Sequence, residues 1–122
     1  MISRTWAVLT TDAVQAWWAS LDDKGQRVLV RGQALLAVHG VHLGYPYTSK
    51  IRTSRHPHMR ELRLLDRARP LRVLFAFDPL RRAVLLVGGD KTGDAQFYRR
   101  LIPVADRLYD EHVRDLKREG LI

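Results

Sequence analysis

The sequence predicts an α+β fold in which one strand and two helices precede three strands and a final helix. Apolar residues recur at helical spacing before residue 40 and after residue 94, and three strand-like runs lie between residues 60 and 87. The turns that join these three runs are short, which favours an antiparallel meander. We therefore expect a β-α-α-β-β-β-α order, with a mainly antiparallel sheet packed against helices.

The composition indicates a basic globular protein. A chain of 122 residues is long enough to form one hydrophobic core, so we expect residues 1–122 to form a single domain. Hydrophobic residues make up 46% of the chain, which is typical of a globular protein. The 21 Lys and Arg residues exceed the 13 Asp and Glu residues, giving a formal net charge of +8. This excess predicts an anionic partner, either nucleic acid or an acidic protein.

Several classes of protein are disfavoured. There is no cysteine, which excludes disulfides and thiolate metal sites. The segment from Met1 to Leu9 lacks the apolar stretch of a signal peptide, and no apolar run reaches the roughly 20 residues that span a bilayer. We therefore expect a cytoplasmic protein with no membrane partner.

Two features of the sequence resemble ligand-binding sites, a histidine pair and a glycine-rich loop, but neither has the residues that such a site needs. His39 and His42 are close in sequence, but no third metal ligand is placed near them. The loop from Gly88 to Gly93 is glycine-rich, yet it lacks the Gly-Lys-Ser/Thr order of a nucleotide-binding loop. We expect no metal, no cofactor and no NTPase activity.

The first half of the chain is predicted to be a strand followed by a helical hairpin. The short apolar run from Trp6 to Leu9 indicates the strand. Asp12 and Gln15 fit a capping box that would begin the first helix, whose apolar face is Val14, Trp17, Trp18 and Leu21. The periodicity favours a core role for the two tryptophans, with base stacking as the alternative.

A second helix should follow directly. Asp23 and Gln26 repeat the capping pattern, and Gly40 is a natural helix end. The helix would run from about Lys24 to Val38, with one apolar side formed by Val28, Leu35 and Val38.

The second half is predicted to contain the meander and a long helix. The strands are Arg60–Leu65, Pro70–Phe77 and Ala83–Val87, of which the last is apolar enough to be covered on both faces. The helix should begin near Asp94, and Pro103 should kink or restart it. Its apolar stripe is Phe97, Leu101, Val104, Leu108 and Leu116.

The basic residues suit the cleavage of RNA by side chains alone. In that reaction a base removes the proton of a 2′-hydroxyl, the oxygen attacks the neighbouring phosphate, and an acid protonates the leaving 5′-oxygen. Fixed cations stabilise the negative charge of the transition state. Cationic, imidazole and phenol groups are concentrated from Lys50 to Arg72, and again at Lys91 and Tyr98.

Arg72 and Tyr98 are the strongest candidates. A charge in the apolar strand around Arg72 is costly unless the side chain is paired or functional. An ion pair with Glu61, Asp66 or Asp90 is the structural alternative, and both roles can hold together. The apolar stripe assigns Phe97 to the core, which leaves Tyr98 available to stack on a base or donate a proton.

The loop from Ser49 to His58 and the strand after it supply the other candidates. Arginine stays protonated and suits phosphate binding, whereas histidine titrates near neutrality and suits proton transfer. Arg60 and Arg63 should point to opposite faces of their strand because their spacing is odd. We predict that the RNA-binding residues are Lys50, Arg52, Arg55, His56 and Arg63. The predicted catalytic residues are Arg72, Lys91, Tyr98, His58 and Arg60. For any single loop residue, an ordinary solvated role is the alternative.

Four segments resemble the RelE/ParE toxin superfamily, and in particular the HigB-like, phage-derived branch of type II toxin–antitoxin systems. They read HLGYPYTSKIRTSRHPHMRELRL, PLRVLFAFDP, LLVGGDKTGDAQFY and IPVADRLYDEH. The resemblance covers essentially the whole chain and is most specific in its second half. It implies a RelE-like small domain with a twisted sheet, and a ribosome-dependent endonuclease that cleaves mRNA in the ribosomal A site. It also implies a cognate helix-turn-helix antitoxin.

The resemblance implies roles for individual residues. Arg72 matches the arginine that stabilises the scissile phosphate, and Tyr98 matches a stacking tyrosine if the preceding loop is two residues longer. Lys91 lies near a basic residue that precedes the last helix. Glu61 stands where RelE has a catalytic lysine, so the general base must differ, with His56, His58 and Arg60 as candidates.

Two other functions remain open on the sequence. One is a toxin of the ParE type, which would act on DNA gyrase through protein contacts without cleaving RNA. The other is a relic that only associates with its antitoxin or with RNA.

Overall fold

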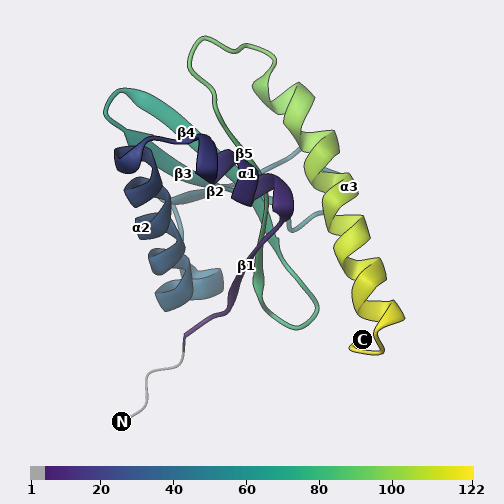
Figure 1. Cartoon of the computed structure of the whole chain (residues 1–122). Helices are drawn as coiled ribbons and strands as arrows, with labels where there is room; N and C mark the ends of the chain where they lie inside the picture. The colour runs from purple at the N-terminus through teal and green to yellow at the C-terminus, as the bar shows by residue number, and fades with distance from the viewer. Residues whose placement is uncertain (1–4) are drawn as a thin grey trace.

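The structure is a computed structural model, and it describes residues 5–122. A sheet lies between two helices on one face and one long helix on the other (Figure 1). Three short elements complete the order: β1, a 3-10 turn called η1 after α2, and β2. The elements are β1 Val8–Thr10, α1 Asp12–Ser20, α2 Asp23–His39, η1 Gly40–His42, β2 Thr48–Lys50, β3 Arg60–Asp66, β4 Arg69–Phe77, β5 Ala83–Asp90 and α3 Phe97–Arg118.

The sheet has five strands in the order β1-β5-β4-β3-β2. The pairs β2–β3, β3–β4 and β4–β5 are antiparallel, and only β1 runs parallel to its neighbour. The α+β class, the mainly antiparallel sheet and the meander are therefore confirmed. No helix in residues 5–122 is both long enough and apolar enough to cross a membrane.

The strand β2 is an addition to the predicted order. It overlaps the start of the segment predicted to be a basic loop, Ser49 to His58, and its Thr48, Ser49 and Lys50 pair with Leu62, Glu61 and Arg60 of β3. Its three polar residues carry no hydrophobic alternation, so nothing local indicates a strand. It forms because β3 offers an unpaired edge.

Side chains of the central strands alternate between two cores. Leu71, Val73 and Phe75 of β4 pack toward α1 and α2, whereas Leu74 and Ala76 pack toward α3. In β5 every residue from Ala83 to Leu86 is buried, which confirms that this strand is covered on both faces. The two cores hold the sheet rigidly between its helices.

Both N-caps lie one residue before the predicted ones. The Thr11 hydroxyl accepts from the backbone N–H of Val14, and the Asp22 carboxylate accepts from that of Gly25. A cap residue is extended and bonds to the N–H three residues on, which Thr11 and Asp22 satisfy. Asp12 and Asp23 instead occupy the first helical turn, where the helix dipole favours a negative charge.

Other details of the helices also differ from the prediction. Trp18 and Val38 are 37% and 60% exposed, so neither belongs to the core, while Leu29 and Leu36 form the buried side of α2. The helix α3 begins at Phe97 and continues through Pro103 without a restart. Ile102 and Ala105 are buried on either side of Pro103, and this packing stabilises the helix there.

Candidate active site

Arg72 is buried beside Glu61. Strands β3 and β4 place Arg63 opposite Arg72 and Glu61 opposite Leu74. Arg72 is only 7% exposed, and its Nε lies 3.4 Å from Oε1 of Glu61. Of the three carboxylates that the sequence offers, Glu61 is therefore the partner.

The hydrogen bonding of Arg72 is incomplete. Its Nη1 donates to the carbonyl oxygen of Leu71 at 3.0 Å, but its buried Nε has no hydrogen-bond partner among residues 5–122. A buried donor without an acceptor is costly and rare. A guanidinium in this state can gain a bond by turning toward an incoming anion.

Glu61 joins four elements at one point. Its carboxylate accepts the hydroxyl of Tyr98 on α3 at 2.6 Å and the hydroxyl of Ser49 on β2 at 2.7 Å. Arg72 on β4 contacts the same carboxylate, and Nη1 of Arg63 lies 3.9 Å from it. Glu61 is 6% exposed, and these partners offset the cost of burying its charge.

Tyr98 is half-buried, and Phe97 next to it is in the core as predicted. Burial and the hydrogen bond to Glu61 raise the pKa of Tyr98, against the opposing effect of Arg72. The phenol therefore stays protonated near neutral pH and acts as a donor. Nζ of Lys91 lies 3.4 Å from the Tyr98 hydroxyl and 5.2 Å from the centre of its ring. Lys91 thus extends the chain of polar contacts outward.

Two of the predicted RNA-binding residues are tied to α3 instead. Arg55 pairs with Asp110 at 2.5 Å, and Nε2 of His56 lies 2.9 Å from the same carboxylate. Asp110 raises the pKa of Arg55, and Arg55 in turn lowers the pKa of Asp110. The backbone N–H of Arg55 and the hydroxyl of Ser54 also bond to Asp106. These contacts anchor the basic loop to the helix.

Three other predicted residues lie away from Glu61. Lys50, His58 and Arg60 line a pocket together, and Arg60 donates to the hydroxyl of Thr48 at 2.8 Å. Arg63 lies on the Glu61 side, so the prediction that Arg60 and Arg63 face opposite ways is confirmed. Arg52 is exposed on the loop after β2.

The structure thus brings together only part of the predicted set. Arg72, Lys91, Tyr98 and Arg63 meet around Glu61, whereas Lys50, Arg52, Arg55, His56, His58 and Arg60 do not. Sequence reasoning named Glu61 as an ion-pair partner of Arg72 and did not consider it as a base. Its hydrogen bonds to Ser49 and Tyr98 depend on β2 and on the packing of α3, which local sequence does not reveal.

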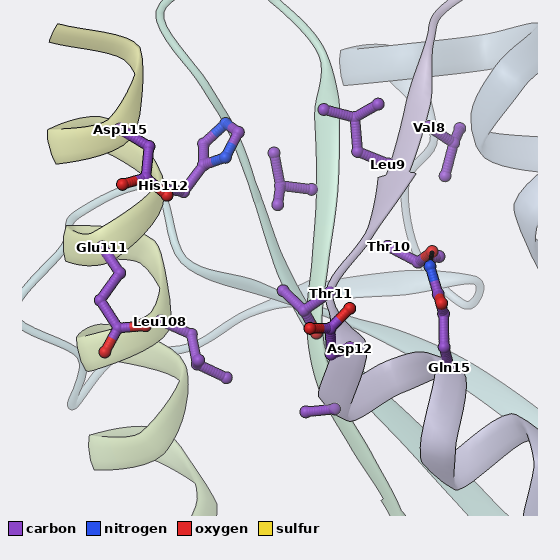
Figure 2. A pocket seen from close by; sticks show the side chains of 12 residues that line it. Val8, Leu9, Thr10, Thr11, Asp12, Gln15, Leu108, Glu111, His112 and Asp115 are labelled. Carbon is purple, nitrogen blue, oxygen red and sulfur yellow. Dashed lines mark hydrogen bonds between the residues drawn. The ribbon is translucent and has the colours of Figure 1, made fainter. Parts of the chain in front are cut away.

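A groove elsewhere on the molecule is unsuited to RNA. It has a volume of about 640 Å³ and lies between α3 and the segment that joins β1 to α1. Figure 2 shows Glu111, His112 and Asp115 on α3, across the groove from Thr11 and Asp12. No lysine or arginine lines this groove, and its carboxylates are Asp12, Glu111, which pairs with Arg107, and Asp115, which pairs with Arg118, so the groove offers a phosphate no cation. Within residues 5–122, no group of three acidic or histidine side chains is placed to hold a metal ion.

Comparison with known proteins identifies the family. The model of the family described as "Phage derived protein Gp49-like (DUF891)" matches residues 16–110. Two proteins of Mycobacterium tuberculosis (strain ATCC 25618 / H37Rv) are similar. "Putative toxin HigB2" is 36% identical over 104 residues, which are 84% of this chain and 52% of that protein. "Putative toxin HigB3" is 37% identical over 102 residues, which are 83% of this chain and 88% of that protein.

The chain therefore spans about half the length of HigB2 and most of the length of HigB3. No solved structure matches it at a significant level. The family match covers far more than half of the residues, and the related proteins agree with it. This chain belongs to the phage-derived Gp49-like family, the HigB-like branch that the sequence resemblance predicts.

Proposed function

We propose that this chain is the toxin of a type II toxin–antitoxin module and that it cleaves mRNA on the ribosome. The observation that carries the proposal is the buried Arg72, whose Nε lies 3.4 Å from a carboxylate shared with Tyr98 without making a hydrogen bond. The toxin names of two relatives and the net charge of +8 support it. The cleavage needs no cofactor, because side chains can supply the base, the acid and the cation.

Arg72 would stabilise the transition state. Attack of the 2′-oxygen on the phosphorus gathers negative charge on the phosphate oxygens before the bond to the 5′-oxygen breaks. A guanidinium can contact two of these oxygens at once. Arg72 would leave Glu61 and turn its free donors toward the phosphate, and Arg63 beside it would add positive charge.

Glu61 would act as the general base. Its carboxylate is the only acceptor in the described cluster that is not also a donor, and it can take the proton of the 2′-hydroxyl. Lys91 would donate a proton to the leaving 5′-oxygen. Tyr98, which is held protonated, would orient Glu61 and present its ring to a base.

The burial of the site's main groups fits a nuclease that needs a second surface, outside the protein, to align its substrate. Glu61 and Arg72 are both more than nine-tenths buried, so free RNA meets a site whose main groups are paired. We propose that the ribosome supplies the alignment by holding the codon in its A site. A cognate helix-turn-helix antitoxin would neutralise the toxin, and acidic surface on it would complement the basic excess.

Growth of a bacterial host tests this assignment. Expression of the wild-type chain should arrest growth, and Arg72→Ala and Tyr98→Ala should each restore it. Arg72→Lys keeps the charge but loses the bidentate fork, so it should also be inactive while disturbing the fold less. Circular dichroism should show that the variants are folded. Full toxicity of folded Arg72→Lys and Tyr98→Ala would show that the site is wrongly assigned.

A further inference from the structure

A second basic site lies on the other side of the sheet from the Glu61 cluster. It is a pocket of about 480 Å³, and it is bounded by β2, the start of β3 and the turn between β4 and β5. Its cationic and aromatic lining is Trp6, Lys50, His58, Arg60, Phe77 and Arg81. Arg81, Trp6 and Phe77 were not candidates on the sequence.

The positive charge of this pocket is not neutralised from within. None of the described residues places a carboxylate within 4.0 Å of Lys50, Arg60 or Arg81. Asp78 also lines the pocket, but it is buried and fully engaged. Its Oδ1 accepts two backbone N–H groups, and its Oδ2 contacts Arg82 and His112. The pocket therefore offers free cations to a ligand.

An aromatic wall stands beside these cations. The rings of Trp6 and Phe77 meet edge to face at 5.5 Å, and the guanidinium of Arg81 lies 5.1 Å from the Trp6 ring. Arg81 has a φ of 62°, in the left-handed region that non-glycine residues rarely adopt. Arg67, in the turn between β3 and β4, has a similar φ of 58°, so this conformation belongs to the two hairpin turns. Aromatic rings beside arginines are a general means of binding unpaired bases with their phosphates.

The pocket is separate from the Glu61 cluster but can be reached by the same strand of RNA. Phe77 is five residues beyond Arg72 along β4, which corresponds to about 17 Å at roughly 3.3 Å per residue. The edge strand β2 connects the two sites, because Ser49 bonds to Glu61 whereas its neighbour Lys50 lines the pocket. A single strand that crosses this edge would contact both sites.

We propose that this pocket binds a nucleotide of single-stranded RNA outside the cleavage site. The base would contact Trp6 and Phe77, and the phosphate would bind to Lys50, Arg60 and Arg81. An acidic protein segment would satisfy the cations but would leave the aromatic wall unused, so RNA is the better fit. The inference deepens the proposed function, on which its choice of RNA rests.

The test is the binding of an RNA that cannot be cleaved. The probe is a fluorescein-labelled, fully 2′-O-methylated 12-nucleotide strand, and its anisotropy is titrated with the full chain at several salt concentrations. Lys50→Ala and Arg81→Gly remove one cation each, and glycine accepts the backbone conformation at position 81. The matched control is Arg31→Ala, which removes an exposed arginine from α2.

We expect Lys50→Ala and Arg81→Gly each to weaken binding about tenfold and to lower the salt slope by about 0.7, as loss of one phosphate contact with a single strand should. Arg31→Ala should change the affinity less than twofold. Pocket variants that match Arg31→Ala in affinity and slope would overturn the inference. Absence of RNA binding by the wild type at 50 mM salt would overturn it as well.

The outcomes separate this inference from the proposed function. If the wild type binds the probe through the pocket but the host's mRNA remains uncut, the proposed function fails and the pocket stands. If mRNA is cut and the pocket variants bind like the control, only the pocket fails. Poly-L-glutamate serves as a competitor that mimics an acidic protein. If it competes with RNA on the wild type but not on the pocket variants, and these variants bind RNA as tightly as the wild type, the pocket binds an acidic protein. That result would refute the RNA proposal.

Discussion

At the scale of residues, the proposed chemistry depends on one buried carboxylate. Glu61 has two hydroxyl donors and two arginines around it, so its charge is stabilised in a place where an isolated carboxylate would be very costly. In the proposed mechanism the same contacts orient it for proton transfer. Glu61 would then have both a structural and a chemical role, and substitution can separate the two.

Glu61→Gln keeps the shape of the side chain and an oxygen acceptor but removes the base. Cleavage under single-turnover conditions should fall by about 10²- to 10⁴-fold, the usual contribution of a general base. The matched control is Ser49→Ala, which removes one hydrogen bond to Glu61 and should lower the rate less than tenfold. Equal losses in the two variants would mean that Glu61 is only a positioning residue.

The strand pattern of the sequence indicated that Arg72 needs a partner, and the structure pairs it with Glu61, one of the three carboxylates considered. Arg72 is conspicuous because a charge interrupts an apolar run, and a neighbouring strand supplies few partners for it. The sequence did not indicate that Arg55 and His56, both predicted to bind RNA, pair with Asp110 on α3, more than fifty positions along the chain. No local pattern reveals such a contact. Their proposed role in RNA binding remains a prediction.

At the scale of elements, the helix α2 approaches β3 closely through a glycine. A Cβ at Gly32 would lie 2.6 Å from Cδ2 of Leu64 and 3.1 Å from that of Leu62. Glycine is unfavourable within a helix, so this position is kept open by packing against the sheet. The sequence alone shows only a poor helix residue here.

Gly32→Ala should therefore destabilise the protein, even though alanine favours helix. Overpacking of a core commonly costs about 1–3 kcal/mol, which exceeds the roughly 0.5–1 kcal/mol gained from helix propensity. Urea unfolding followed by circular dichroism measures the difference. Gly44→Ala is the control, because no atom lies within 4 Å of a Cβ there. A more stable Gly32→Ala variant would contradict the packing described.

The turn between β4 and β5 is held to α3 by Asp78. Burial raises the pKa of this carboxyl, but its hydrogen bonds to His112 and Arg82 prevail and hold the pKa below its usual value of 3.8. The folded protein therefore binds this proton less tightly than the unfolded chain does. The stabilisation is present above about pH 4 and is lost as the pH falls through the lowered pKa.

Asp78→Asn should lower the free energy of unfolding by about 1–3 kcal/mol at pH 7, because several buried hydrogen bonds lose their charge. The difference in melting temperature from the wild type should be constant above about pH 5 and should shrink as the pH falls below about 4, where the wild type loses this stabilisation too. Glu119→Gln, an exposed residue after α3, serves as the control and should show no such convergence. A gap that stays constant with pH would show that Asp78 does not act through its charge.

Elements with a strong apolar period were predictable, and short polar ones were not. The meander, α1, α2 and α3 follow from their patterns, because burial of one face determines each of them. The strand β2 depends on the free edge of β3, and the helix caps depend on which residue is extended, so neither could be placed from local sequence. Because Ser49 and Lys50 are neighbours on β2, one contacts Glu61 and the other lines the basic pocket. This division of the loop between two sites could not be predicted either.

At the scale of the whole molecule, the acidic groove and the basic pocket occupy different places. The groove with Asp12, Glu111 and Asp115 lies between α3 and β1, whereas the pocket lies where β2, the start of β3 and the turn between β4 and β5 meet Trp6, just before β1. A polyanion would be attracted to the cations of the pocket and not to the groove. The strand β2 adjoins both proposed RNA sites, because Ser49 contacts Glu61 and Lys50 lines the pocket.

The central claim is that the Glu61 and Arg72 cluster cleaves translated mRNA, and mapping of mRNA 5′ ends in a bacterial host tests it most directly. Brief expression of the wild type should create new 5′ ends inside translated reading frames. Arg72→Lys, expressed to the same level, should reduce these ends at least about 100-fold, the scale expected for loss of a main transition-state contact. Growth arrest without new 5′ ends would contradict the claim and point to another target, such as DNA gyrase.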